Sequence, residues 1–236
     1  MKAKPSLKSI LVLSTFLATA ATAAQAHQHG DGSNTSSKKG HAQGYHRKFN
    51  DAKHWVKVFD DPARDKWQLP SKVVEALQVK PKEVVADIGA GTGYFSFRIA
   101  KAQPESKIYA ADVEKDMLTF LAEESKRQNC TNVIPFEIST TKPELPEKAD
   151  LALIVDTFHH IDDRVRYFKD LQSSLTPDCR LVIIDFTEKS PVGPPQDHRI
   201  EKEEVIAELK ESGFTLSNEK EFLPYQYFLE FRKAKK

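Results

Sequence analysis

Three glycines at alternate positions form the strongest chemical signal in this sequence. Gly89, Gly91 and Gly93 follow the β-branched segment 84–88, whose pattern predicts a strand, and a helical stretch comes after them. Because glycine has no side chain, such a turn lets a ligand lie against the backbone and meet the N–H groups at the start of the helix. The turn therefore predicts a ligand-binding site where this strand ends.

A carboxylate at the end of the next predicted strand supports that prediction. Asp112 closes the segment 107–113 and follows Asp87 by 25 residues. A carboxylate in this place can accept two hydrogen bonds from the ribose diol of a nucleoside. The dinucleotide fingerprint requires its third glycine at position 94, which is Tyr94, and no Gly-Lys-Ser/Thr phosphate loop is present. A dinucleotide-dependent oxidoreductase is therefore the less favoured alternative.

Strands and helices alternate through the part of the chain that positions these residues. Further strands are predicted at 132–138, 151–155, 181–186, about 214–222 and 226–231. Continuous apolar runs in two of them are typical of strands buried on both faces, as in a parallel sheet. Helices are predicted at 115–128, at 163–175 with Asp162 as its cap, and at 201–212 before Gly213. This alternation predicts a three-layer, doubly wound α/β fold.

The pattern D-x-G-x-G-x-G from Asp87 to Gly93 resembles the first motif of class I S-adenosylmethionine-dependent methyltransferases. The resemblance extends from about Phe59 to the C-terminus and is closest to the group that includes quinone-biosynthesis C-methyltransferases. It implies a Rossmann-like, mostly parallel seven-stranded sheet in the order 3-2-1-4-5-7-6, with the last strand antiparallel. It also implies S-adenosylmethionine as the cofactor, with Asp87 and the turn at its methionine end and Asp112 at its ribose. The cofactor contacts that we expect are Asp87, Gly89, Ala90, Gly91, Thr92, Gly93, Tyr94, Asp112, Val113 and Asp156.

The same resemblance places methyl transfer to a small-molecule acceptor beside residues 156–160, at the end of the fourth strand. Candidate bases are Asp156, His159, His160 and His198, since histidine titrates near neutrality, although either adjacent histidine could serve only as a packed wall. Arg199 follows the proline-rich stretch 190–197, where the family often contacts substrate or where the loop is merely held. Arg64 and Trp67 fall in the variable helix that covers the cofactor, and they either touch the ligands or clamp that helix to the sheet.

Composition excludes several other classes of protein. The 236 residues carry a formal net charge of +1, which disfavours a nucleic-acid binder that works by neutralising phosphates. Two cysteines are too few for a disulfide scaffold or a four-cysteine zinc site. In the family's strand order Cys130 and Cys179 would precede strands four positions apart, beyond disulfide reach, so two free thiols are expected. No constellation of residues predicts a metal site, and the oligomeric state is not readable.

The first 46 residues are predicted to lie outside the fold. Three lysines (Lys2, Lys4 and Lys8), an uncharged run at 9–26 and the small-x-small triplet at 24–26 predict a signal peptide cleaved after Ala26. That peptide would send the protein to the periplasm or the exterior of a bacterium, without stable membrane insertion after cleavage; the run is short for a transmembrane anchor.

Residues 27–46 are predicted to be a disordered linker, 47–80 a helical cap and 81–236 the methyltransferase domain. The linker histidines (His27, His29, His41 and His46) either bind a transition metal loosely or belong to a plain spacer. An alternative function, an exported binding protein that keeps the fold without catalysis, stays open at this point.

Overall fold

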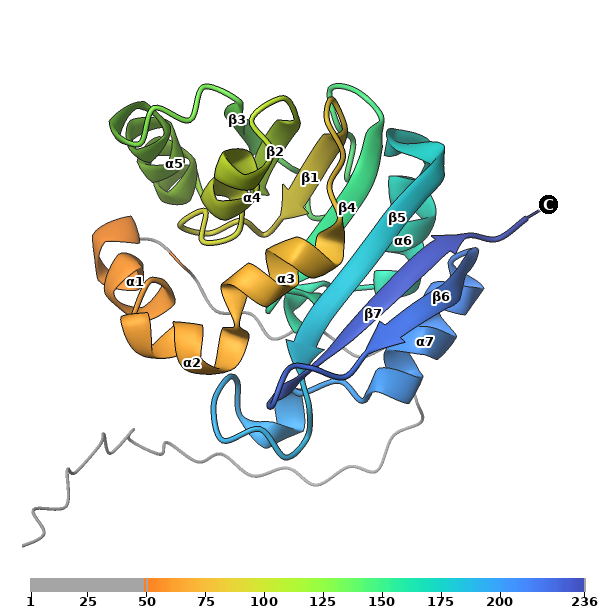
Figure 1. Cartoon of the computed structure of the whole chain (residues 1–236). Helices are drawn as coiled ribbons and strands as arrows, with labels where there is room; N and C mark the ends of the chain where they lie inside the picture. Colours follow the sequence, from red (N-terminus) through yellow and green to blue (C-terminus); the bar gives the residue numbers. More distant parts are fainter. Residues whose placement is uncertain (1–48, 50, 236) are drawn as a thin grey trace, which may run out of the picture. The chain divides into compact units, whose positions relative to one another are not determined.

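The computed structural model describes residues 49 and 51–235, so the predicted signal peptide and linker lie outside the described residues. One sheet runs through it in the order β3-β2-β1-β4-β5-β7-β6 (Figure 1). Strands β1 to β5 pair in parallel, and β7 is antiparallel to both β5 and β6, which confirms the predicted fold. The strands are β1 Val84–Ile88, β2 Lys107–Asp112, β3 Val133–Glu137, β4 Ala149–Val155, β5 Leu175–Phe186, β6 Phe214–Lys220 and β7 Gln226–Lys233.

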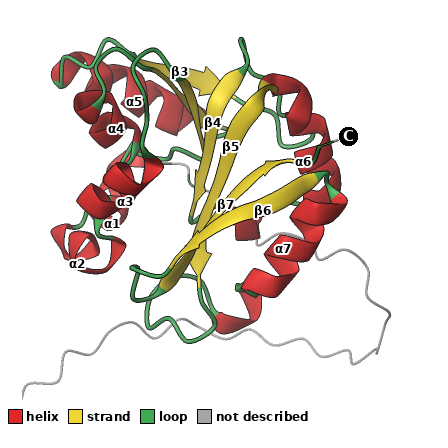
Figure 2. Cartoon of the chain, turned by 45° about the vertical axis from the view of Figure 1, so that its right-hand side comes forward, coloured by secondary structure: helices red, strands yellow, loops and turns green. Residues whose placement is uncertain are grey.

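Helices cover both faces of the sheet, as the view in Figure 2 shows, with α3, α4 and α5 on one face and α6 and α7 on the other. The helices are α1 Ala52–Phe59, α2 Asp65–Gln68, α3 Pro70–Leu77, α4 Ser96–Ala102, α5 Lys115–Arg127, α6 Arg164–Leu171 and α7 Lys202–Glu211, with short 3-10 turns η1 Pro62–Arg64, η2 Phe158–His160, η3 Gln172–Ser174 and η4 Gln196–His198. None of the helices in the described residues has the length and apolar run needed to span a membrane.

The two faces of strand β5 pack into different cores, which explains why its apolar run is continuous. Leu181 and Ile183 pack into the core under α6 and α7, whereas Val182 and Ile184 pack into the core under α3 and α4. Alternate side chains of a strand point to opposite faces, so both faces of this strand need apolar residues.

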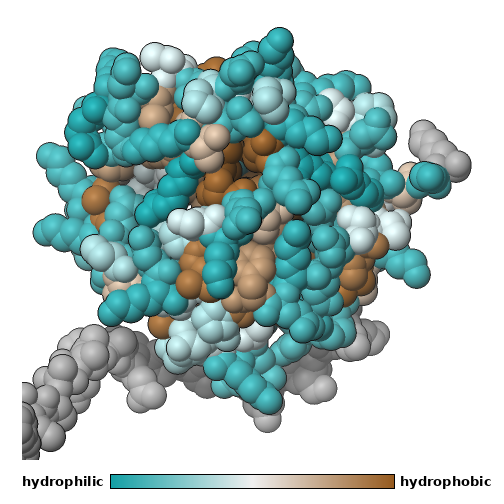
Figure 3. All heavy atoms as spheres, viewed as in Figure 1, coloured by the Kyte–Doolittle hydropathy of each residue, from teal (hydrophilic) through white to brown (hydrophobic). Residues whose placement is uncertain are grey.

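The outer surface in the view of Figure 3 is mainly hydrophilic, with hydrophobic atoms showing only in patches.

The structure corrects two local predictions around α6. The N-cap position is Asp163 rather than Asp162, and the Asp163 side chain makes no capping hydrogen bond. The helix ends at Leu171 rather than at residue 175, because Leu175 already pairs with Ala149 in the sheet. Sheet pairing thus overrides the helical spacing of the apolar residues.

Two other local predictions are confirmed. Gly213 follows α7 with φ of 86°, a left-handed conformation that favours glycine. Cys130 and Cys179 are both buried free thiols; Cys130 precedes β3 as expected, whereas Cys179 lies within β5, which begins earlier than expected, and these two strands are four positions apart in the sheet.

A helical segment precedes the sheet and lies at the end where β1, β2 and β4 finish; we refer to residues 51–69, which contain α1, η1 and α2, as the cover. Its aromatic side chains pack on α5: Trp55 clusters with Met117 and with Phe59, whose ring stacks on that of Trp55 at 5.2 Å between centroids. This apolar contact holds the cover beside the glycine turn.

Candidate active site

The three glycines of the turn have different structural reasons to be glycine, although all have positive φ (76°, 56° and 81°). A Cβ atom on Gly89 would lie 2.4 Å from the Thr157 side chain, and one on Gly93 would lie 2.5 Å from Phe97. A Cβ atom on Gly91 would meet only the Phe59 ring of the cover, at 3.5 Å. Packing therefore requires the first and third glycines, and the middle one faces the space under the cover.

Asp112 is held against this turn by the backbone. Its Oδ2 accepts from the Gly91 N–H at 2.8 Å and its Oδ1 from the Glu114 N–H at 2.9 Å. Burial raises the pKa of Asp112, while these backbone donors lower it. Each oxygen keeps a further lone pair, so the carboxylate can still accept hydrogen bonds from a diol. Val113, the next residue, is 46% exposed and offers an apolar surface at the same edge.

The other predicted contacts of the turn fasten neighbouring elements. Asp87 accepts from the Ser96 hydroxyl at 2.6 Å and so ties β1 to the start of α4; burial raises its pKa to about 6. The Thr92 hydroxyl donates to Asp60 at 2.9 Å, and the Tyr94 hydroxyl donates to Asp65. Both acceptors belong to the cover.

Four side chains close a ring of hydrogen bonds beneath the cover, and we call Arg64, Gln68, Asp156 and Gln226 the polar ring. Arg64 donates from Nη2 to Asp156 Oδ2 at 2.9 Å and from Nε to Gln68 Oε1 at 3.2 Å. Gln68 donates to Gln226 at 2.5 Å, and Gln226 donates to the second oxygen of Asp156. Sequence reasoning missed both glutamines, which lie 158 residues apart and carry no chemical signature.

Arg64 has more contacts to the cover and the turn. Its Nη1 donates to the Phe59 carbonyl at 3.0 Å, and its guanidinium carbon lies 4.0 Å from the centre of the Tyr94 ring, which has Arg98 at 3.8 Å as well. The clamping role is therefore the one its contacts support. The Trp67 ring lies 5.8 Å from that of Phe186, at the end of β5.

His159 is paired with a buried aspartate that sequence reasoning missed. Its Nδ1 lies 2.9 Å from both carboxylate oxygens of Asp185, and its backbone N–H donates to the same group at 3.3 Å. Burial lowers the pKa of His159, but the Asp185 and Asp156 carboxylates together raise it more, so the pKa lies above the usual 6.5. The ring of His160 lies 4.1 Å from that of His159 and packs edge-on against Phe49.

The loop after β5 is organised by Arg199. Its guanidinium donates to backbone carbonyls of the loop, namely those of Thr187, Glu188, Ser190, Val192 and Pro194. These contacts support the interpretation that it holds the loop. His198 lies in the same loop, with Nε2 3.9 Å from the Asp197 carboxylate.

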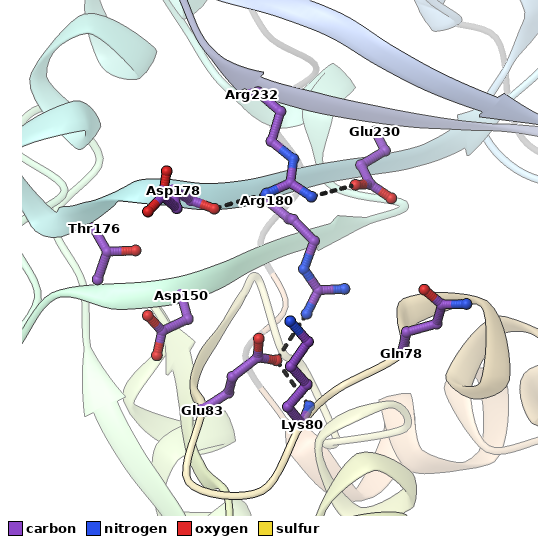
Figure 4. A pocket seen from close by; sticks show the side chains of 9 residues that line it. All are labelled: Gln78, Lys80, Glu83, Asp150, Thr176, Asp178, Arg180, Glu230 and Arg232. Carbon is purple, nitrogen blue, oxygen red and sulfur yellow. Dashed lines mark hydrogen bonds and ion pairs between the residues drawn. The ribbon is translucent and has the colours of Figure 1, made fainter.

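A separate pocket of 260 Å³, shown in Figure 4, lies at the opposite end of the strands, where the parallel strands begin. Its buried Arg180 donates to the Leu77 carbonyl at the end of α3 and pairs with Glu83 at 2.7 Å. Both acidic and basic side chains line it, and the contacts of Arg180 and Arg232 join α3 to β5 and β7 to β5. This pocket is distinct from the glycine turn, and its contacts hold neighbouring elements of the fold together.

The carboxyl ends of four neighbouring strands each bring an aspartate to the site: Asp112 from β2, Asp87 from β1, Asp156 after β4 and Asp185 from β5. Such a set suits a ligand with cationic groups and hydroxyl donors, while Arg64 suits its carboxylate. S-adenosylmethionine carries a sulfonium, an ammonium, a ribose diol and a carboxylate, so the residues present fit it. Among the described residues, His, Cys, Asp and Glu side chains form no group of three that could hold a metal ion.

Comparison with known proteins agrees with this fit. A family model described as a methyltransferase domain matches residues 86–181. The structure of a SAM-dependent methyltransferase from Aquifex aeolicus aligns with a TM-score of 0.71 and 25% identity, over 78% of this chain and 98% of that one. The chain belongs to the class I S-adenosylmethionine-dependent methyltransferases. S-adenosylmethionine is accordingly the cofactor that the family implies, and the residues at the glycine turn fit it.

Curated proteins that this chain resembles are named for different methyl acceptors. Phosphoethanolamine N-methyltransferase 1 of Zea mays is 29% identical over 151 residues, which is 63% of this chain and 28% of that protein. Malonyl-[acyl-carrier protein] O-methyltransferase 1 of Ilyobacter polytropus is 29% identical over 136 residues, 57% of this chain and 50% of the relative. The chain thus spans half the length of these relatives or less.

Proposed function

We propose that this protein transfers a methyl group from S-adenosylmethionine to a small-molecule acceptor. The observation that carries the proposal is Asp112, held against the Gly91 backbone where β1 and β2 end and where the cover closes over them. When bound, the cofactor supplies an electrophilic methyl group on a positively charged sulfur. The chain then has to align donor and acceptor and exclude water, which is what a cover over the strand ends can do.

We assign the roles of the site residues as follows. Asp112 binds the ribose, Val113 lies beside the base, and Arg64, which clamps the cover, also lies near enough to the turn to meet the carboxylate of the methionine end. Acceptor chemistry takes place near Asp156, which belongs to the polar ring, and near His159. One relative is named for methylating an amine and another for methylating a carboxyl group, so the acceptor of this chain has to be found by experiment.

Ligand-dependent stability tests the proposal. A ligand at 100 times its dissociation constant adds about 2.7 kcal/mol to the free energy of unfolding, or roughly 5–10 °C in melting temperature for a chain of this size. We expect S-adenosylmethionine and its demethylated product to give such a shift in the purified protein, and Asp112→Ala to lose it. Asp170→Ala, at an exposed position of α6, is the matched control and should keep the shift. The absence of a shift with both ligands in the unaltered protein would refute a cofactor site at this turn.

We also propose that the protein is exported, on the pattern of residues 1–26 alone. A C-terminally tagged chain expressed in a Gram-negative bacterium should then be recovered from the periplasm, with His27 as its first residue. Recovery in the cytoplasm with residue 1 intact would contradict export.

A further inference from the structure

We propose that Asp185 positions His159 as the general base of the reaction, and that the acceptor is a hydroxyl, an amine or a thiol, which must lose a proton, rather than a carboxylate. This inference rests on the proposed function and names the chemical class of its acceptor.

The Asp185 carboxylate is held in place by the backbone as well as by its contact with the histidine. It is the second-last residue of β5, it is 2% exposed, and its Oδ1 accepts from the Phe186 backbone N–H at 2.8 Å. The backbone N–H of His159 reaches the same carboxylate at 3.3 Å, so the main chain of η2 and the imidazole are both held by one group. Contact of Nδ1 with a carboxylate keeps the hydrogen on Nδ1 and leaves the lone pair on Nε2.

The other ring nitrogen, Nε2, is available for chemistry. Among the described residues no hydrogen-bond partner of His159 Nε2 is found, and the one fully buried side-chain nitrogen or oxygen without a partner is Arg164 Nη1. His159 Nε2 therefore keeps access to space outside the core, although the residue is 4% exposed. Rings of His160 and Phe186 flank the imidazole, and Trp67 of the cover packs on Phe186.

Charged groups from three elements face the imidazole. Asp185 on β5 and Asp156 after β4 raise the pKa of His159, whereas Arg164 on α6 lowers it. The balance favours an imidazolium once a proton has arrived, and Asp185 stabilises it.

The step balances as follows. A lone pair of the acceptor atom forms the bond to the methyl carbon, and the methyl–sulfur bond breaks with its electron pair remaining on sulfur. The acceptor's proton passes to His159 Nε2 and later leaves to solvent. A carboxylate acceptor would be ionised already at neutral pH and would have no proton to give. It would also be repelled by the aspartates at the strand ends.

Histidine NMR tests the positioning role without turnover. Spectra of protein labelled with ¹⁵N-histidine should show His159, assigned with His159→Gln, as the Nδ1–H tautomer with a pKa above 6.5. In Asp185→Asn the pKa should fall by about one unit or more, since a carboxylate partner is removed, and the tautomer should change. An unchanged pKa and tautomer in a folded Asp185→Asn protein would overturn the role of Asp185. His198→Gln, in the loop after β5, controls for the assignment.

Kinetics tests the acceptor class. A set of four acceptors, a phenol, a primary amine, a thiol and a carboxylic acid, is offered with S-adenosylmethionine. We expect turnover within the first three, with kcat lowered about 100-fold or more by His159→Gln and by Asp185→Asn, and KM nearly unchanged. Methylation of the carboxylic acid, or equal kcat in Asp185→Asn, would overturn the proposal. Failure of the unaltered protein to bind S-adenosylmethionine would instead refute the proposed function, and the NMR result would still decide the histidine–aspartate pair.

Discussion

The middle and last glycines of the turn should respond very differently to the same substitution. Alanine at either position has to adopt a positive φ, which is 56° at Gly91 and 81° at Gly93. At Gly91 the new methyl group would meet only the Phe59 ring, at an ordinary contact distance of 3.5 Å. At Gly93 it would lie 2.5 Å from Phe97 and 2.7 Å from Leu121, both in the core.

The expected costs follow from these distances. A left-handed conformation costs a non-glycine residue about 1–2 kcal/mol, and overpacking a core adds about 1–3 kcal/mol. Gly91→Ala should therefore lose about 1–2 kcal/mol of folding free energy and Gly93→Ala about 2–5 kcal/mol. For a chain of this size the melting temperature should fall by roughly 3–6 °C in the first variant and roughly 7–14 °C in the second.

Urea unfolding of both variants without ligand measures this difference, and calorimetric titration with S-adenosylmethionine measures the effect on binding. Gly91→Ala should lose more than tenfold in affinity despite its small loss of stability, because its methyl group occupies the space between the turn and the cover. Equal destabilisation by the two substitutions, or full affinity in Gly91→Ala, would refute our account of which glycine faces the ligand.

Three further substitutions test other parts of the structure. Because burial raises the pKa of Asp87 to about 6, the folded protein binds a proton that the unfolded chain releases above pH 3.8, so stability should fall as pH rises from about 4 to 6. Urea titrations across this range should show that contribution removed in Asp87→Asn. Gln226→Leu leaves the buried Gln68 amide without its acceptor and removes a donor from the half-buried Asp156 carboxylate, so it should cost about 2–5 kcal/mol in urea unfolding, against almost nothing for the exposed control Gln196→Leu. Arg199→Lys removes most of the carbonyl contacts of its loop, so trypsin should cut faster at Lys189 while the melting temperature changes little.

Local sequence patterns were sufficient for most of the strands and helices and for the glycine turn with its acidic partner. Short β-branched runs, helical spacing between them and the position of Gly213 follow from backbone geometry, which acts over a few residues. Asp112 was predictable for the same reason, since an acid that ends the strand after a glycine turn is a local feature. The resemblance to a known family supplied the strand order, which periodicity alone does not give.

Residues that meet only through the fold were missed. Asp185 stands in an apolar run that was correctly predicted as a strand, yet its partner His159 becomes visible only when β5 is placed beside β4. Gln68 and Gln226 are ordinary polar residues in sequence, and their role depends on the cover lying over the end of β7. The predicted end of α6 was also wrong for a non-local reason, because Leu175 pairs with Ala149 in the sheet.

The cost of assembling this site explains why its ligand should be a cation. Burial raises the pKa values of Asp87 and Asp156 to about 6, so at neutral pH both are ionised at some expense of folding free energy. The ion pair with Arg64, which the cover brings to the strand ends, offsets part of this free-energy cost for Asp156. A sulfonium and an ammonium group placed among the same aspartates would offset more, because opposite charge favours the ionised carboxylates. The features that destabilise the unliganded site are therefore those expected to bind the cofactor, and its binding should stabilise the cover and the sheet together.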